Sequence, residues 1–151
     1  MEANQLRIFI ESTIDYFQKV TGIKAEAGLP RTVEESDNFL SDITGAIGIA
    51  GDVQGAIYLT GTRDFFAGLL ASFNPESERS DENILDAAGE LANTIAGNGQ
   101  KVFGNGLRIS VPMIITGNGP QLRMREPRYL IPIQWNEHRF SLVIGINDVN
   151  D

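Results

Sequence analysis

Glu90 and Asn93 are the polar residues whose types and spacing best suit chemistry, and they lie in the segment 80–101. Residues at positions i and i+3 of a helix are neighbours, so the two side chains can reach the same external group. Hydrolysis of an acyl phosphate needs mainly a well-placed water and neutralised charge. A neutral carboxamide can donate to and accept from that water without repelling a phosphoryl group, which suits Asn93. A carboxylate would be repelled there, so Glu90 suits contact with a cation on a partner.

The segment that carries this pair has the pattern of a long helix with two different faces. At about 100° of rotation per residue, one face is apolar and the opposite face carries the polar pair. The apolar face is formed by Ile84, Leu85, Ala88, Leu91, Ala92, Ile95, Ala96 and Val102. Asp86, Gly97 and Lys101 fall on the polar face beside Glu90 and Asn93, and we expect them to contact the same partner. Gly97 has no side chain to block the approach of another backbone. The same pattern is also typical of a solvated helix face without a ligand.

The elements around this helix predict an α+β fold with long helices packed on a mainly antiparallel sheet. Helices are predicted over residues 3–20 and 63–73, and from Ser80 to an end between Asn98 and Gly106. The first helix has an apolar stripe of Leu6, Ile10, Thr13, Phe17 and Val20, widened by Phe9, Ile14 and Tyr16. Strands are predicted over residues 23–27, 39–50, 55–60, 107–116, 121–125, 129–135 and 140–146, and a loop over 31–37. Thr62 and Ser80 are predicted helix caps.

Composition restricts the possible functions. The chain has 151 residues, and we expect residues 1–151 to form one domain. A net charge of −8 disfavours binding to nucleic acid or an anionic membrane. The absence of cysteine excludes disulfides and thiolate chemistry. No segment is apolar enough to span a membrane, and the N-terminus lacks a secretory pattern, so we expect a cytoplasmic protein.

Other sequence features have simpler interpretations. His138 is the only histidine, so no metal site built on several histidines is possible, and we expect His138 to be a surface residue of the turn 136–138. Arg123, Arg125 and Arg128 form a local basic cluster that we interpret as a solvated strand face, with contact to an anion or partner as the alternative. The glycines between 45 and 55 are interpreted as bulges or as points where a helix approaches the sheet closely.

The sequence DAAGELANTIAGN at residues 86–98 resembles the Glu-x-x-Asn signature helix of the CheC/CheX/FliY phosphatases, and the CheX type in particular. Residues 20–28, VTGIKAEAG, and the hairpin at 47–60, IGIAGDVQGAIYLT, also resemble that family. The resemblance covers nearly the whole chain. CheC-type members carry the signature twice, but here Glu11 is followed at the corresponding position by Ile14, which favours the single-site CheX type.

The resemblance implies a CheC/CheX-like fold, often as a homodimer, and dephosphorylation of the phospho-aspartate on a CheY-like response regulator. Glu90 would contact a lysine of the receiver domain, and Asn93 would position the attacking water. The chain itself would hold no cofactor or metal, and Mg²⁺ would belong to the response regulator. The alternatives are a noncatalytic module that binds a receiver or motor component, and a dimerisation domain with a merely solvated helix face.

Overall fold

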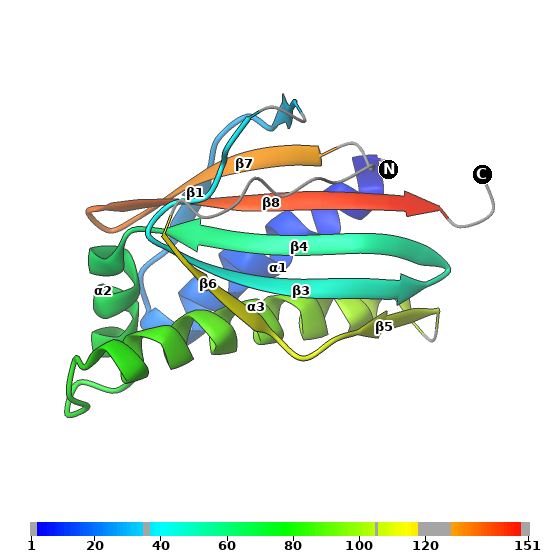
Figure 1. Ribbon diagram of the computed structural model, residues 1–151. Coiled ribbons are helices and arrows are strands. Elements are labelled where there is room, and N and C mark those ends of the chain that lie inside the picture. Colours follow the sequence, from blue (N-terminus) through cyan, green and yellow to red (C-terminus); the bar gives the residue numbers. More distant parts are fainter. Residues whose placement is uncertain (1–2, 35–36, 105, 118–127, 149–151) are drawn as a thin grey trace.

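The computed structural model describes residues 3–34, 37–104, 106–117 and 128–148. Within these ranges the chain forms three helices and one antiparallel sheet, so the predicted α+β fold is confirmed (Figure 1). The helices are α1 (Ala3–Thr21), α2 (Arg63–Phe73) and α3 (Asp81–Phe103). The strands are β1 (Ala25–Ala27), β2 (Arg31–Val33), β3 (Ile43–Gly51), β4 (Val53–Gly61), β5 (Leu107–Ile109), β6 (Met113–Thr116), β7 (Arg128–Trp135) and β8 (His138–Asp148).

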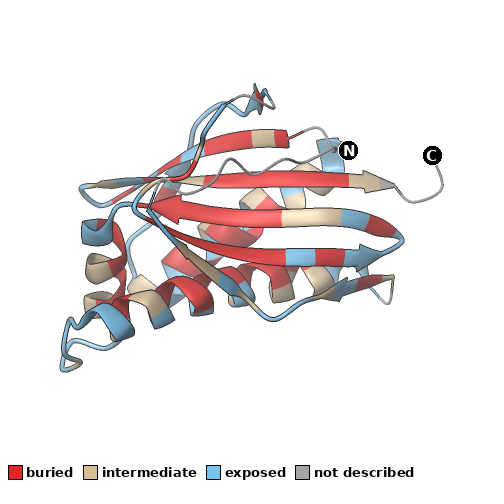
Figure 2. Ribbon diagram, in the orientation of Figure 1, coloured by how far each residue is buried: buried red, intermediate tan, exposed pale blue. Residues whose placement is uncertain are grey.

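The sheet is built on four long antiparallel strands, β7, β8, β4 and β3. Its order is β1-β7-β8-β4-β3-β5, with β2 also pairing with β7 and β6 with β3. The hairpin β3–β4 is centred on Asp52, close to the predicted turn, and places Ile47 opposite Ile57. Figure 1 shows α1 and α3 side by side along one face of this sheet. That face holds the main core, and Figure 2 shows buried positions along β8, β4, β3 and the two long helices.

The structure confirms the two predicted helix caps, Thr62 at the start of α2 and Ser80 at the start of α3. The Thr62 hydroxyl accepts a hydrogen bond from the Phe65 amide at 3.1 Å, and the Ser80 hydroxyl accepts one from the Asn83 amide at 3.2 Å. Each bond satisfies an amide that has no partner within its helix. The last residue of α3 is Phe103, and Gly104 follows with a φ of 85°, a conformation that glycine adopts without strain. The end of α3 therefore lies within the predicted interval.

Close packing positions α3 against the sheet and against α1. A Cβ placed on Gly45 of β3 would lie 2.6 Å from the Ala88 carbonyl oxygen, so the helix backbone lies directly on the strand at this point. This confirms the predicted close approach of a helix for Gly45. On the α1 side, Gly99 packs against the ring of Phe9, and Phe9 in turn lies 5.6 Å from the Phe103 ring centroid.

Two predicted elements were wrong in part. Residues 31–33 form β2 against β7 instead of a loop, because pairing with a long strand stabilises a short polar segment that has no pattern of its own. The single strand predicted over 107–116 is two strands, β5 and β6, which both pair with β3. Pro112 lies in the break between them and has no amide hydrogen to donate to a ladder. The strand predicted at 121–125, with Arg123 and Arg125, lies outside the described residues.

Two side chains lie in more buried positions than predicted. His138 is not a turn residue: the turn is Asn136–Glu137, and His138 begins β8, half-buried, with its ring stacked 5.9 Å from the Trp135 ring centroid. Arg128 is not on a solvated face, since it is only 2% exposed. Its guanidinium donates to the Glu34 carbonyl and lies 5.8 Å from the centre of the Phe39 ring.

In the described part of the chain, no helix is both long and apolar enough to cross a membrane.

Candidate functional site

The polar face of α3 is open to solvent, as predicted. Glu90, Asn93, Asp86 and Lys101 are exposed, and Gly97 is half-buried. With a rise of about 1.5 Å per residue, Glu90 and Asn93 are separated by about 4.5 Å along the helix axis. The same rise places Asp86 and Lys101 about 22 Å apart, which is too long for one small ligand but suits contact with another protein.

The opposite face of α3 fixes the orientation of this polar face. Its predicted apolar residues are buried, with the exception of Leu85, which is half-buried, and Val102. The prediction for Val102 was wrong, because its side chain is 62% exposed. Val102 lies at the edge of the apolar arc and near the end of the helix, where it lines a groove instead of entering the core.

Glu90 and Asn93 are free to bind something outside the chain. Neither side chain forms a hydrogen bond or an ion pair with another residue that the structure describes. Asp86 and Lys101 likewise have no ion-pair partner within the described ranges. An exposed carboxylate next to an uncommitted carboxamide can therefore offer acceptors to a cation and both a donor and an acceptor to water.

Tyr16 of α1 is a neighbour of Glu90 that the sequence did not reveal. Burial and, to a smaller extent, the negative charge of Glu90 together raise the pKa of Tyr16 to about 12. The Tyr16 side chain is 6% exposed. The sequence assigned Tyr16 only to the apolar stripe of the first helix, because one sequence does not show which residues of two helices meet. The packing of α1 against α3 makes α1 the second element beside the site, and the effect of the Glu90 charge on Tyr16 agrees with that packing.

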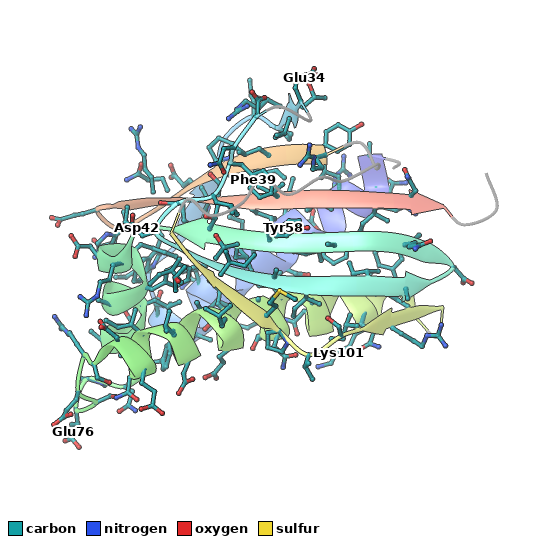
Figure 3. All side chains as sticks on the ribbon, in the orientation of Figure 1. Glu34, Phe39, Asp42, Tyr58, Glu76 and Lys101 are labelled. Carbon is teal, nitrogen blue, oxygen red and sulfur yellow. The ribbon has the colours of Figure 1, made fainter. Side chains whose placement is uncertain are left out.

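A groove of about 450 Å³ runs between α1 and α3, and it is lined by Tyr16 and by Thr94, the residue after Asn93, but not by Glu90 or Asn93 themselves. The α1 side includes Asp15, Tyr16 and Lys19, and the α3 side includes Thr94, Asn98 and Lys101. Lys101 is labelled in Figure 3, near the C-terminal end of α3. The groove is therefore lined by both signs of charge and by uncharged polar groups.

Gly97 opens the surface one turn after Asn93. A Cβ placed on Gly97 would meet no other atom within 4 Å. By contrast, Gly89 on the same helix faces Ile114 of β6, whose side chain would lie 3.3 Å from an added Cβ. Packing within the described chain thus gives a reason for the glycine at 89 but none for the glycine at 97.

The first helix does not provide a second copy of the Glu90–Asn93 arrangement. Glu11 is exposed, but Ile14 is half-buried and packs against the main core. An apolar side chain at that position cannot orient water.

Among the described residues, no group of three His, Cys, Asp or Glu side chains comes together as a set of metal ligands. A larger hollow of about 540 Å³ lies over β3, β4 and β5, lined in part by Gln54 and Arg108, and it includes none of the predicted site residues.

Comparisons with known proteins agree with the fold. Residues 43–134 match the model of a family described as chemotaxis phosphatase CheX, and this range contains the whole of α3. No curated protein sequence matches the chain. Three similar solved structures are a CheC-like superfamily protein from Shewanella, a chemotaxis protein CheX from Desulfovibrio desulfuricans, and a CheX–CheY–BeF3–Mg²⁺ complex from Borrelia burgdorferi.

The similarity to these structures lies in the fold and not in close sequence identity. The Shewanella protein has 19% identity and a TM-score of 0.85, and the match covers 97% of this chain and 99% of that one. The Desulfovibrio protein has 20% identity and a TM-score of 0.82, with coverage of 96% and 99%. The Borrelia complex has 16% identity and a TM-score of 0.79, with coverage of 97% and 100%.

Proposed function

The chain belongs to the CheX family of chemotaxis phosphatases, and we propose that it dephosphorylates the phospho-aspartate of a CheY-like response regulator. The observation that carries this proposal is the exposed, uncommitted pair of Glu90 and Asn93 on α3, within the segment that matches the family. The related complex from Borrelia burgdorferi contains CheY together with CheX, which supports a receiver domain as the partner.

Asn93 is the residue we assign to the chemical step. Its carboxamide accepts a hydrogen bond from the attacking water and donates one to it, which orients the water oxygen toward phosphorus. The new bond joins this oxygen to phosphorus, and the bond from phosphorus to the aspartyl oxygen breaks. The aspartate leaves as a carboxylate, inorganic phosphate is released, and a proton of the water passes to phosphate or solvent.

Glu90 is the residue we assign to holding the receiver. A carboxylate next to a phosphoryl group would be repelled, whereas contact with a lysine of the receiver neutralises its charge. Asp86, Gly97 and Lys101 extend the same contact along α3, with Gly97 allowing the receiver backbone to come close. In this proposal Mg²⁺ would be held by the response regulator, where it would supply charge neutralisation for the phosphoryl group, and this chain would supply no metal ligand and no cofactor.

We further propose that the chain acts in the cytoplasm, where its substrate is phosphorylated, and that it forms a homodimer. The family resemblance in the sequence supports both expectations. The dimer is tested by light scattering at the concentrations used for the enzyme assay, and a strict monomer would argue against this part of the proposal.

The test measures the decay of phosphorylated CheY-like receivers from the same genome with and without this protein. We expect Asn93→Ala to lower kcat by about 100-fold or more, with receiver binding nearly unchanged, because positioning groups act mainly in the transition state. We expect Glu90→Ala mainly to raise KM. Asn98→Ala is the matched control for kcat, since it removes the same amide group further along α3.

Three outcomes would argue against this function or for one of its alternatives. Binding of the receiver without faster decay would identify a noncatalytic module that recognises receivers. Full acceleration by a folded Asn93→Ala variant would show that Asn93 does not position the water. If no receiver from the genome binds, the polar face of α3 is a solvated surface of a structural domain.

A further inference from the structure

The Tyr16 hydroxyl is an uncommitted polar group at the end of a buried ring. The ring packs in the main core, 5.3 Å from the Phe17 ring centroid in an edge-to-face arrangement. The hydroxyl forms no hydrogen bond with any residue that the structure describes. Among those residues, however, no fully buried side-chain polar atom lacks a partner. The hydroxyl oxygen must therefore be reached from outside the core, and the groove that Tyr16 lines is the open space beside it.

A buried tyrosine without an internal partner is an unusual choice for packing alone. Phenylalanine would fill the same space in the core, whereas tyrosine adds a hydroxyl that reaches the groove and has no hydrogen-bond partner among the described residues. Tyr16 is also the largest polar side chain in the groove between α1 and α3. These observations indicate that the hydroxyl has a partner outside this chain.

Glu90 determines what kind of group that partner can be. Glu90 lies one turn before Thr94, which lines the groove together with Tyr16, and its negative charge raises the pKa of the Tyr16 phenol, yet no hydrogen bond joins the two side chains. A group that binds between them meets one negative and one neutral oxygen. An anion would be repelled by Glu90, and an apolar group would leave both oxygens unpaired. An ammonium group has three donors and no acceptor, so it satisfies both oxygens at once.

The other charged groups of the groove are compatible with this occupant. Asp15 contributes a further carboxylate on the α1 side. Lys19 and Lys101 also line the groove, but neither forms an ion pair with Glu90 or with another described residue. The acceptors beside Tyr16 are thus not already occupied by a cation of this chain.

We propose that Tyr16 is a specificity-determining residue, whose hydroxyl oxygen accepts a hydrogen bond from the same lysine ammonium of the receiver that binds the Glu90 carboxylate. The inference rests on the proposed function, because it names the second contact of the lysine that Glu90 holds. Tyr16 touches the partner and not the reacting phosphoryl group, so it affects binding and not the chemical step. Recognition of the receiver then requires α1 as well as α3.

The first test is receiver binding by Tyr16→Phe, measured by calorimetry with receiver that is loaded with BeF3 and Mg²⁺. Loss of one hydrogen bond from a charged ammonium group is expected to weaken binding about 10- to 150-fold. In the decay assay KM rises while kcat at saturation stays the same. Tyr129→Phe is the matched control, because it removes a hydroxyl from β7 and should leave binding unchanged. Equal affinities of wild type and a folded Tyr16→Phe variant would overturn the proposal.

The second test is a double-mutant cycle between the two proteins. The relevant lysine of the receiver is identified by substitution with Met: in the Met-containing receiver, Glu90→Gln no longer changes the binding affinity. Tyr16→Phe should likewise leave the affinity for that receiver unchanged, since both contacts involve one ammonium group. If Tyr16→Phe weakens binding to the Met-containing receiver by the same factor as before, Tyr16 does not contact that lysine.

A third measurement needs no variant of this chain. With ¹³C-labelled tyrosine rings, the Tyr16 signal of the wild-type protein should shift when receiver binds and should stay in place with the Met-containing receiver. An identical shift with both receivers would contradict the proposal. All three binding measurements are independent of catalysis. They can support the Tyr16 contact even if receiver decay is not accelerated, and they can refute it even if acceleration is observed.

Discussion

The electrostatic coupling between Glu90 and Tyr16 gives a quantitative prediction about the free protein. The pKa of Tyr16 is raised from 10.0 to about 12, first by burial and second by the charge of Glu90. Since Glu90 is the smaller cause, it accounts for less than half of a rise of about two. Glu90→Gln removes the charge and keeps the size of the side chain. It should therefore lower the pKa of Tyr16 by less than about one unit, or less than about 1.4 kcal/mol of coupling.

The assay is an alkaline titration followed by the ultraviolet absorbance of tyrosinate. Tyr58 and Tyr129 also absorb, so the titration of Tyr16 is isolated as the difference between each protein and its Tyr16→Phe counterpart. Asp86→Asn is the control substitution, because it removes a carboxylate one turn earlier on the same face of α3. It should change the pKa of Tyr16 less than Glu90→Gln does.

The same pKa predicts how stability depends on pH. Below pH 10, Tyr16 is neutral in both the native and the unfolded chain, so it contributes no pH dependence. Between pH 10 and 12 the unfolded Tyr16 ionises and the native one does not, so the free energy of unfolding falls as pH rises. The fall should amount to roughly 2–3 kcal/mol, and Tyr16→Phe should lack it.

In the titration described above, an unchanged or higher pKa of Tyr16 in the Glu90→Gln variant would refute the proximity of the two side chains.

Two glycine substitutions test the packing of α3. Gly97→Ala should raise the free energy of unfolding by about 0.5–1 kcal/mol in urea titrations, because the added methyl meets nothing in the free chain and alanine favours a helix. The same variant should bind the receiver more weakly in calorimetry, and unchanged affinity would show that no backbone approaches Gly97. Gly45→Ala should lower the free energy of unfolding by about 1–3 kcal/mol, since its methyl would lie 2.6 Å from the Ala88 carbonyl oxygen. An unaltered urea midpoint for Gly45→Ala would mean that the helix moves away from the sheet at little cost.

Local patterns were enough to predict the helices and the exposed face of α3. Ser80 and Thr62 could be assigned as caps because a capping side chain acts on amides within a few residues. The polar face was predictable because helix periodicity alone sorts Glu90 and Asn93 from the residues that enter the core. The roles of these two residues stay predictions, since exposure does not reveal what binds them.

Features that depend on contacts between distant segments could not be predicted in the same way. Arg128 is buried because Glu34 and Phe39, far away in sequence, provide a carbonyl and an aromatic ring for its guanidinium. His138 is half-buried because it faces Trp135 across a two-residue turn and lies over α2. Tyr16 is beside Glu90 only because α1 packs against α3. A single sequence contains no signal for such pairings.

The packing of α3 also determines how damage elsewhere in the chain would reach the site. Three glycines allow α3 to pack closely against three neighbours. Gly45 of β3 lies directly under the helix, and Gly89 and Gly99 of α3 face β6 and α1. The spacing between Glu90 and Asn93 is set by the helix alone, whereas their position relative to α1 is set by these contacts. An added methyl at any of the three would displace both side chains together as a rigid body. Such variants should keep the geometry of the pair and lose its alignment with α1.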